Sequence, residues 1–108
     1  MIGGAQLAAL PAHAYLVDIS RGGVVDHEAL VRALEKESFA GAAVDVFPEE
    51  PLPADSPLWD MPNVLVSPHV AGLSPHYEER AITLLSENLE RFLAGEELLN
   101  RYDPERGY

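Results

Sequence analysis

The 108-residue sequence has no cysteine, few basic residues and no long apolar run. The absence of cysteine excludes disulfide bonds and thiolate chemistry. Seven lysines and arginines against 18 acidic residues give a net charge of −11. This charge disfavours nucleic acids and anionic membrane surfaces as partners, since both require a cationic surface. No apolar run reaches the length of a membrane span and the N-terminus lacks a signal-peptide pattern, so we expect a cytoplasmic protein.

The composition is otherwise that of an ordinary globular domain. Apolar residues make up 47% of the chain, which argues against disorder throughout. The length suits one domain with a modest core. The simplest interpretation of the many acidic residues is a solvated surface that keeps the protein soluble, and no metal site is expected.

Strand-length apolar runs alternate with helical or irregular segments in the first two thirds of the chain. The runs cover residues 14–19, 39–47 and 63–67. A short helix is expected over residues 4–10, ended by Pro11, and a second from the capping residue Asp26 to about Glu37. Four prolines over residues 48–57 predict an irregular loop. The pattern predicts an α/β fold with three parallel strands and both faces of the sheet covered.

A long helix is expected in the last third of the chain. Ser74 is the expected cap and Pro75 the first helical residue, with an end at Ala94 and Gly95. An apolar stripe at helical spacing predicts core packing; it comprises Tyr77, Ala81, Leu84, Leu85, Leu89, Phe92 and Leu93. We therefore expect three parts: residues 1–74 with the strands, residues 75–95 with the long helix, and a tail of residues 96–108.

Polar residues follow each predicted strand, where open parallel sheets bind their ligands. Arg21 follows the first strand, Glu50 lies in the loop after the second, and His69 follows the third. An arginine fork can hold a carboxylate, and a histidine can give or take a proton. A nearby carboxylate can orient the imidazole and favour its protonated form. The set suits a substrate with a carboxylate beside a carbonyl or hydroxyl group.

Each of these residues alone has a plainer interpretation. Arg21 could be a surface ion-pair partner, Glu50 a solvated loop residue and His69 a structural hydrogen-bonding group. Their occurrence at three successive strand ends, beside glycines and prolines, favours a functional site. The other histidines are interpreted as structural.

Four stretches of the chain resemble the C-terminal part of the D-isomer-specific 2-hydroxyacid dehydrogenases: LVDISRGGVVDHEALVRAL (16–34), AGAAVDVFPEEPLPADSPLW (40–59), NVLVSPHVAG (63–72) and NLERFLAGE (88–96). The resemblance implies the C-terminal portion of a Rossmann-type doubly wound sheet, NAD or NADP as cofactor, and hydride transfer between a 2-oxoacid and a D-2-hydroxyacid. The implied catalytic residues are Arg21, which binds the substrate, His69, which donates the proton, and Glu50, which pairs with His69.

The resemblance also implies residues that contact the cofactor. Asp45 would touch its nicotinamide end, and the predicted cofactor-binding set is Ser20, Arg21, Asp45, His69 and Gly72. One departure from the family is Asp18, where asparagine is usual. Its charge could compete for the Arg21 guanidinium, or it could point to solvent.

A larger departure is that the family's Gly-x-Gly-x-x-Gly phosphate loop does not occur in these residues. We expect a truncated enzyme with little or no dehydrogenase activity for residues 1–108 alone, or alternatively a non-catalytic remnant that serves as an interaction module. The first strand would be an unpaired edge, which suggests that more sheet once preceded it. The apolar stripe of the long helix would lack its usual partner, so self-association through this helix, and hence a homo-oligomer such as a dimer, is expected.

Overall fold

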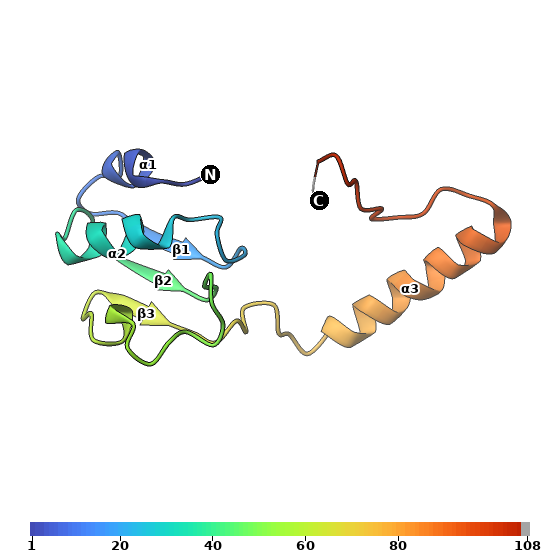
Figure 1. Ribbon diagram of the computed structural model, residues 1–108. Helices are drawn as coiled ribbons and strands as arrows, with labels where there is room; N and C mark the ends of the chain where they lie inside the picture. The colour runs from blue at the N-terminus through green and yellow to red at the C-terminus, as the bar shows by residue number, and fades with distance from the viewer. Residues whose placement is uncertain (107–108) are drawn as a thin grey trace. The chain divides into compact units, whose positions relative to one another are not determined.

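A computed structural model of the chain describes residues 1–106, which divide into two compact units. The first unit, Met1–Ala71, contains helices α1 (Gly4–Ala8) and α2 (His27–Glu35), strands β1 (Tyr15–Asp18), β2 (Gly41–Val44) and β3 (Val64–Val66), and the 3₁₀ helix η1 (Pro57–Trp59) (Figure 1). The second unit starts at Gly72 and contains helix α3 (Tyr77–Ala94). The predicted α/β class, three strands and long C-terminal helix are confirmed.

The three strands form one parallel sheet in the order β1-β2-β3. In the register, Val17 pairs with Ala43 and Ala43 with Leu65. The carboxyl ends of all three strands therefore lie at the same edge of the sheet, which is where the predicted site residues follow.

The core of the first unit lies between the helices and one face of the sheet. Asp26 caps α2 as predicted, since its carboxylate accepts a hydrogen bond from the Ala29 backbone N–H at 2.9 Å. Helix α2 then buries an apolar face against the sheet. The buried cluster comprises Leu7, Val25, Ala29, Leu30, Leu34, Phe39, Ala42, Val44, Phe47 and Leu58.

Within the first unit, Met1–Ala71, only one face of the sheet is covered, so this unit does not show the predicted cover on both faces. Tyr15, Val17 and Leu65 lie on the other face with large exposed fractions. The cause is topological. Both crossovers run in the same direction across the sheet, and right-handed crossovers in one direction all fall on one face.

Helix α3 starts two residues later than predicted. The Ser74 carbonyl accepts a hydrogen bond from the Tyr77 N–H at 3.1 Å, so Ser74 and Pro75 belong to a turn before the helix. The first residue is Tyr77, and His76 takes the capping position. The end is as predicted, because Gly95 adopts the left-handed conformation (φ 71°) that a glycine adopts without strain.

The core packing predicted for the apolar stripe of α3 is not seen among residues 1–106, where no residue of this helix is buried. The tail, for which no regular pattern was predicted, is attached by the Asn88 side chain. Its amide donates to the Leu99 carbonyl at 3.2 Å and accepts from the Leu99 N–H at 2.7 Å. None of the helices within residues 1–106 is long and apolar enough to cross a membrane.

Candidate active site

Arg21, Glu50 and His69 meet at the carboxyl edge of the sheet, where the sequence predicted a shared site. Arg21 comes from the turn after β1, Glu50 from the loop after β2 and His69 from the turn after β3. The His69 imidazole lies between the other two. Its Nδ1 atom is 2.8 Å from Glu50 Oε2, and its Nε2 atom is 3.5 Å from Arg21 Nη1.

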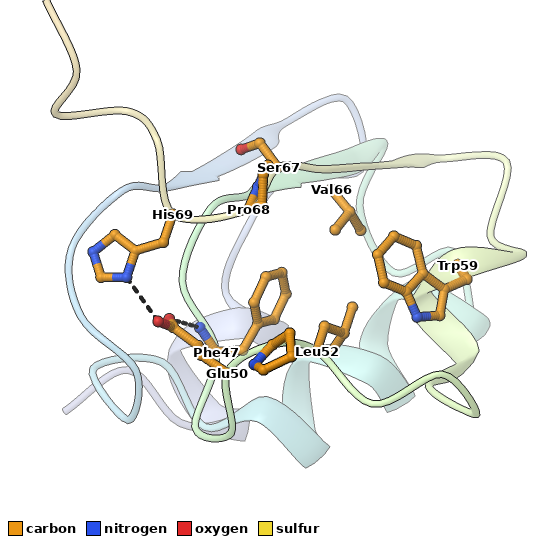
Figure 2. Close-up of a pocket in the computed structure, with 9 residues that line it drawn as sticks. Phe47, Glu50, Leu52, Trp59, Val66, Ser67, Pro68 and His69 are labelled. Carbon is orange, nitrogen blue, oxygen red and sulfur yellow. Dashed lines mark hydrogen bonds and ion pairs between the residues drawn. The ribbon is translucent and has the colours of Figure 1, made fainter.

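The Glu50 carboxylate is held from two sides. Oε2 contacts His69, and Oε1 accepts a hydrogen bond from the Phe47 N–H at 2.9 Å (Figure 2). The hydrogen bond with His69, followed by that from Phe47, lowers the pKa of Glu50 below its ordinary value. Glu50 is therefore ionised at neutral pH and can only accept, so the proton of the pair lies on His69 Nδ1. This leaves Nε2 as the imidazole atom free to exchange a proton with a substrate.

Arg21 is exposed and is not paired with a carboxylate among residues 1–106. Its Nη1 atom donates to the Ser20 carbonyl at 2.7 Å, and the other guanidinium donors remain open. A guanidinium in this state, beside an imidazole, can bind a carboxylate of a ligand with two parallel hydrogen bonds.

Asp18, the departure from the family pattern, neither pairs with Arg21 nor points to solvent. It is buried, and its Oδ1 atom accepts hydrogen bonds from the Ser20 N–H at 3.1 Å and the Ser20 hydroxyl at 2.6 Å. Asp18 thus closes a common type of turn, in which an aspartate side chain accepts a hydrogen bond from the backbone two residues later. This turn places Ser20 and Arg21 at the edge of the site.

Asp45 is buried beside the same edge, with an exposed fraction of only 2%. Its Oδ1 atom accepts hydrogen bonds from the Ser67 hydroxyl at 2.5 Å and the Val70 N–H at 2.9 Å. Its Oδ2 atom accepts from the Ala71 N–H at 2.9 Å. These donors, the Ser67 hydroxyl first, lower the pKa of Asp45 below its ordinary value although burial opposes them. Asp45 is therefore an anion bound by the protein itself.

Gly22 brings the Arg21 turn against the loop that carries Glu50. A Cβ atom added to Gly22 would lie 2.2 Å from the Phe47 carbonyl oxygen. Only glycine allows this approach of two backbones. Its neighbour Gly23 has a different role, because its φ of 87° lies in the region that glycine adopts without strain. The sequence indicated glycines at a sharp turn, but the contact with Phe47 was not predicted.

A mostly apolar cavity of about 610 Å³ lies behind the Glu50–His69 pair. Figure 2 shows Trp59 on its far side from His69, with Phe47, Leu52 and Val66 between them. Glu50 Oε1 and Oε2 both have protein partners, so the cavity offers little to bind a polar ligand. Nε2 of His69 faces Arg21, away from Glu50, and this is the side on which a substrate carbonyl could be protonated.

Two residues important for this arrangement were missed from the sequence. Ser67 binds Asp45, and the Phe47 N–H binds Glu50. Both lie at strand ends next to predicted site residues, which was the available signal. Gly72 belongs to the second unit, so its predicted contact with the cofactor stays a prediction.

The parallel sheet with an arginine, a carboxylate and a histidine at its carboxyl edge is part of a Rossmann-type nucleotide-binding domain. The family model for the D-isomer specific 2-hydroxyacid dehydrogenase NAD binding domain matches residues 1–71. The chain therefore belongs to the D-isomer specific 2-hydroxyacid dehydrogenase family, as the motifs predicted.

Curated relatives agree with this assignment. Glyoxylate/hydroxypyruvate reductase B of Pectobacterium carotovorum is 42% identical over 105 residues, which cover 97% of this chain and 33% of the relative. The chain thus spans about a third of the length of the curated relatives it matches.

Solved structures of the family share the fold. A D-isomer specific 2-hydroxyacid dehydrogenase from Xanthobacter autotrophicus Py2, in complex with NADPH and MES, is 47% identical with a TM-score of 0.88, covering 97% of this chain and 43% of that one. The NADPH-dependent glyoxylate/hydroxypyruvate reductase of Sinorhizobium meliloti, in complex with NADP and sulfate, is 30% identical with a TM-score of 0.87, covering 99% and 35%.

Proposed function

We propose that Arg21, Glu50 and His69 form the catalytic group of an NAD(P)-dependent 2-hydroxyacid dehydrogenase, which reduces a 2-oxoacid to a D-2-hydroxyacid. The observation that carries the proposal is the His69 imidazole, held by Glu50 at Nδ1 and facing Arg21 with Nε2. The names of the similar proteins point to glyoxylate and hydroxypyruvate as substrates to test first.

In this proposal, each residue acts on one part of the substrate. Arg21 binds the carboxylate and brings the neighbouring carbonyl to His69. His69 donates a proton from Nε2 to the carbonyl oxygen as the alcohol forms, and Glu50 stabilises the imidazolium before the transfer. The hydride is supplied by the nicotinamide cofactor.

The residues at the sheet edge fit the nicotinamide end of such a cofactor only in part. Ser20 and Arg21 lie at the carboxyl end of β1, where a Rossmann-type sheet receives its ligand. Asp45 fits less well, because its carboxylate is almost fully buried and has three protein donors. The Gly-x-Gly-x-x-Gly loop is not among these residues, so we expect little or no turnover from residues 1–108 alone.

A chimera tests the proposal. The matched third of the Pectobacterium reductase is replaced by residues 1–108, and NADPH- or NADH-dependent reduction of glyoxylate and hydroxypyruvate is followed at 340 nm. We expect turnover, and we expect His69→Ala to lower kcat by about 10²- to 10⁴-fold, the usual contribution of a general acid, with cofactor affinity largely kept. His13→Ala, an exposed histidine in the loop before β1, is the matched control.

Two results would contradict the proposal. One is a chimera that binds the cofactor but does not reduce either 2-oxoacid. The other is a His69→Ala chimera with the same turnover as the His13→Ala control.

A second candidate function, an interaction module, is favoured by the exposed apolar surfaces. On α3, Leu85, Leu89 and Phe92 are exposed, and so is the apolar face of the sheet. Burying one such side chain fully contributes about 1.5–3 kcal/mol, which favours association of copies through α3. This self-association does not depend on the catalytic proposal.

A further inference from the structure

The backbone around His69 is held by a carboxylate that no catalytic step uses. Asp45 follows β2 directly, and its three donors come from Ser67, Val70 and Ala71. These donors lie on both sides of His69 in the chain. The carboxylate therefore bridges the turn that carries the imidazole.

His69 itself has an unusual backbone conformation. Its φ of 54° lies in the left-handed region, which is unfavourable for residues with a Cβ atom. Such a conformation persists where the surrounding structure enforces it. In this turn the enforcing group is Asp45, since its Oδ1 and Oδ2 atoms fix the N–H groups of the two residues that follow His69.

The left-handed conformation has a consequence for the imidazole. With the backbone in this state, Nδ1 reaches Glu50 at 2.8 Å and Nε2 faces Arg21. A rotation of the backbone to an ordinary φ would turn the side chain away from both partners.

We propose that Asp45 is a positioning residue, whose buried carboxylate clamps the 67–71 turn and thereby aims the His69 imidazole. The catalytic consequence of this role rests on the proposed function, whereas the structural consequence does not. This positioning role differs from the contact with the nicotinamide that was expected for Asp45. Asp45 has an exposed fraction of 2%, and its carboxylate has three internal donors, so it is placed to organise the protein.

The structural part is tested on the 108-residue chain by NMR. In Asp45→Asn the side chain keeps its shape, but an NH₂ group that cannot accept replaces one oxygen. Amide hydrogen exchange at Val70 and Ala71 is expected to speed up by about 10- to 100-fold, as expected for the loss of a hydrogen bond to a charged group. The ring ¹⁵N shifts of His69 should change from the Nδ1–H tautomer toward a mixture of the two.

Variants at Ser67 test the same positioning role of Asp45 if Asp45→Asn fails to fold. Ser67→Ala retains the carboxylate and both backbone hydrogen bonds, so a smaller increase of exchange at Val70 and Ala71 is expected. Ser67→Thr keeps the hydroxyl and should restore the original rates. Asp26→Ala, which removes the α2 cap outside the site, is the control for general destabilisation.

The proposal is overturned if Asp45→Asn and Ser67→Ala change exchange at Val70 and Ala71 no more than Asp26→Ala does. It is also overturned if the His69 tautomer is the same in all variants. These measurements need no catalysis, so they stand even if the chimera shows His69 to be dispensable.

The catalytic part is tested in the chimera. A positioning role predicts that Asp45→Asn and Ser67→Ala both lower kcat while the KM for the cofactor stays within about twofold. A direct contact with the nicotinamide predicts instead that Asp45→Asn raises the KM for the cofactor and that Ser67→Ala, which leaves the carboxylate in place, does not lower kcat. This second pattern would overturn the proposal.

Discussion

The contact between the Arg21 turn and the Glu50 loop can be tested by adding one methyl group at Gly22. A Cβ atom there would lie 2.2 Å from the Phe47 carbonyl oxygen, 2.7 Å from its carbon and 3.1 Å from the Pro48 nitrogen. All three are backbone atoms, so no side chain can rotate away. Gly22→Ala must therefore push the two segments apart.

The cost can be estimated from other cases in which extra volume is forced into a packed site. Such changes cost about 1–3 kcal/mol. With a urea dependence of about 1 kcal/mol per molar for a small domain, the unfolding midpoint should fall by about 1 M or more. The displacement also moves Arg21 and the loop that carries Glu50, so the contacts of His69 should weaken.

Two further glycines provide matched controls. Gly41→Ala places a Cβ 2.3 Å from the Asn63 carbonyl oxygen. Gly41 is the first residue of β2, so it lies at the amino-terminal end of the strand, and the site lies at the carboxyl ends. Gly41→Ala should destabilise the chain to a similar extent without disturbing His69. Gly4→Ala meets only the Ala29 side chain at 3.9 Å and should be neutral or stabilising by up to about 1 kcal/mol.

Urea unfolding can be followed by the fluorescence of Trp59, the single tryptophan, and the site by the ring ¹⁵N signals of His69. We expect a lowered midpoint for Gly22→Ala and Gly41→Ala, and altered His69 signals for Gly22→Ala alone. If Gly22→Ala is as stable as Gly4→Ala, the close approach of the two backbones does not exist and the reasoning is refuted.

The remaining predictions concern acid stability and self-association. The pKa values of Glu50 and Asp45 are lowered in the folded chain, so their contributions to stability are present above the ordinary carboxyl range, near pH 4, and are lost as the pH falls through the depressed values. The unfolding free energy, measured from about pH 6 to pH 3, should decrease below about pH 4. Glu50→Gln should show a shallower decrease. An unchanged slope in this variant would contradict the assigned pairing of Glu50 with His69. Sedimentation velocity should show association of the chain that Leu89→Glu or Phe92→Glu abolishes. Thr83→Glu adds the same charge away from the apolar stripe and should leave the association intact. A chain that is monomeric at high micromolar concentration would argue against the α3 interface.

Much of the fold follows from local sequence signals. Asp26 before an amphipathic segment was sufficient to predict the start of α2, and Gly95 the end of α3. The start of α3 was predicted too early, because a serine followed by proline favours a turn as well as a helix start. Short-range signals cannot distinguish the two, since the choice depends on which N–H reaches the Ser74 carbonyl.

What the sequence alone determined is the composition of the candidate site. Arg21, Glu50 and His69 each follow a predicted strand, and parallel strands must end at one edge, so their convergence needed no coordinates. What only the tertiary structure decided is how these groups are held. The Asp45–Ser67 bond joins residues 22 positions apart, and the Gly22–Phe47 contact joins two loops. Such contacts depend on sheet register and loop conformation to within a fraction of an ångström, which no local pattern of residues specifies.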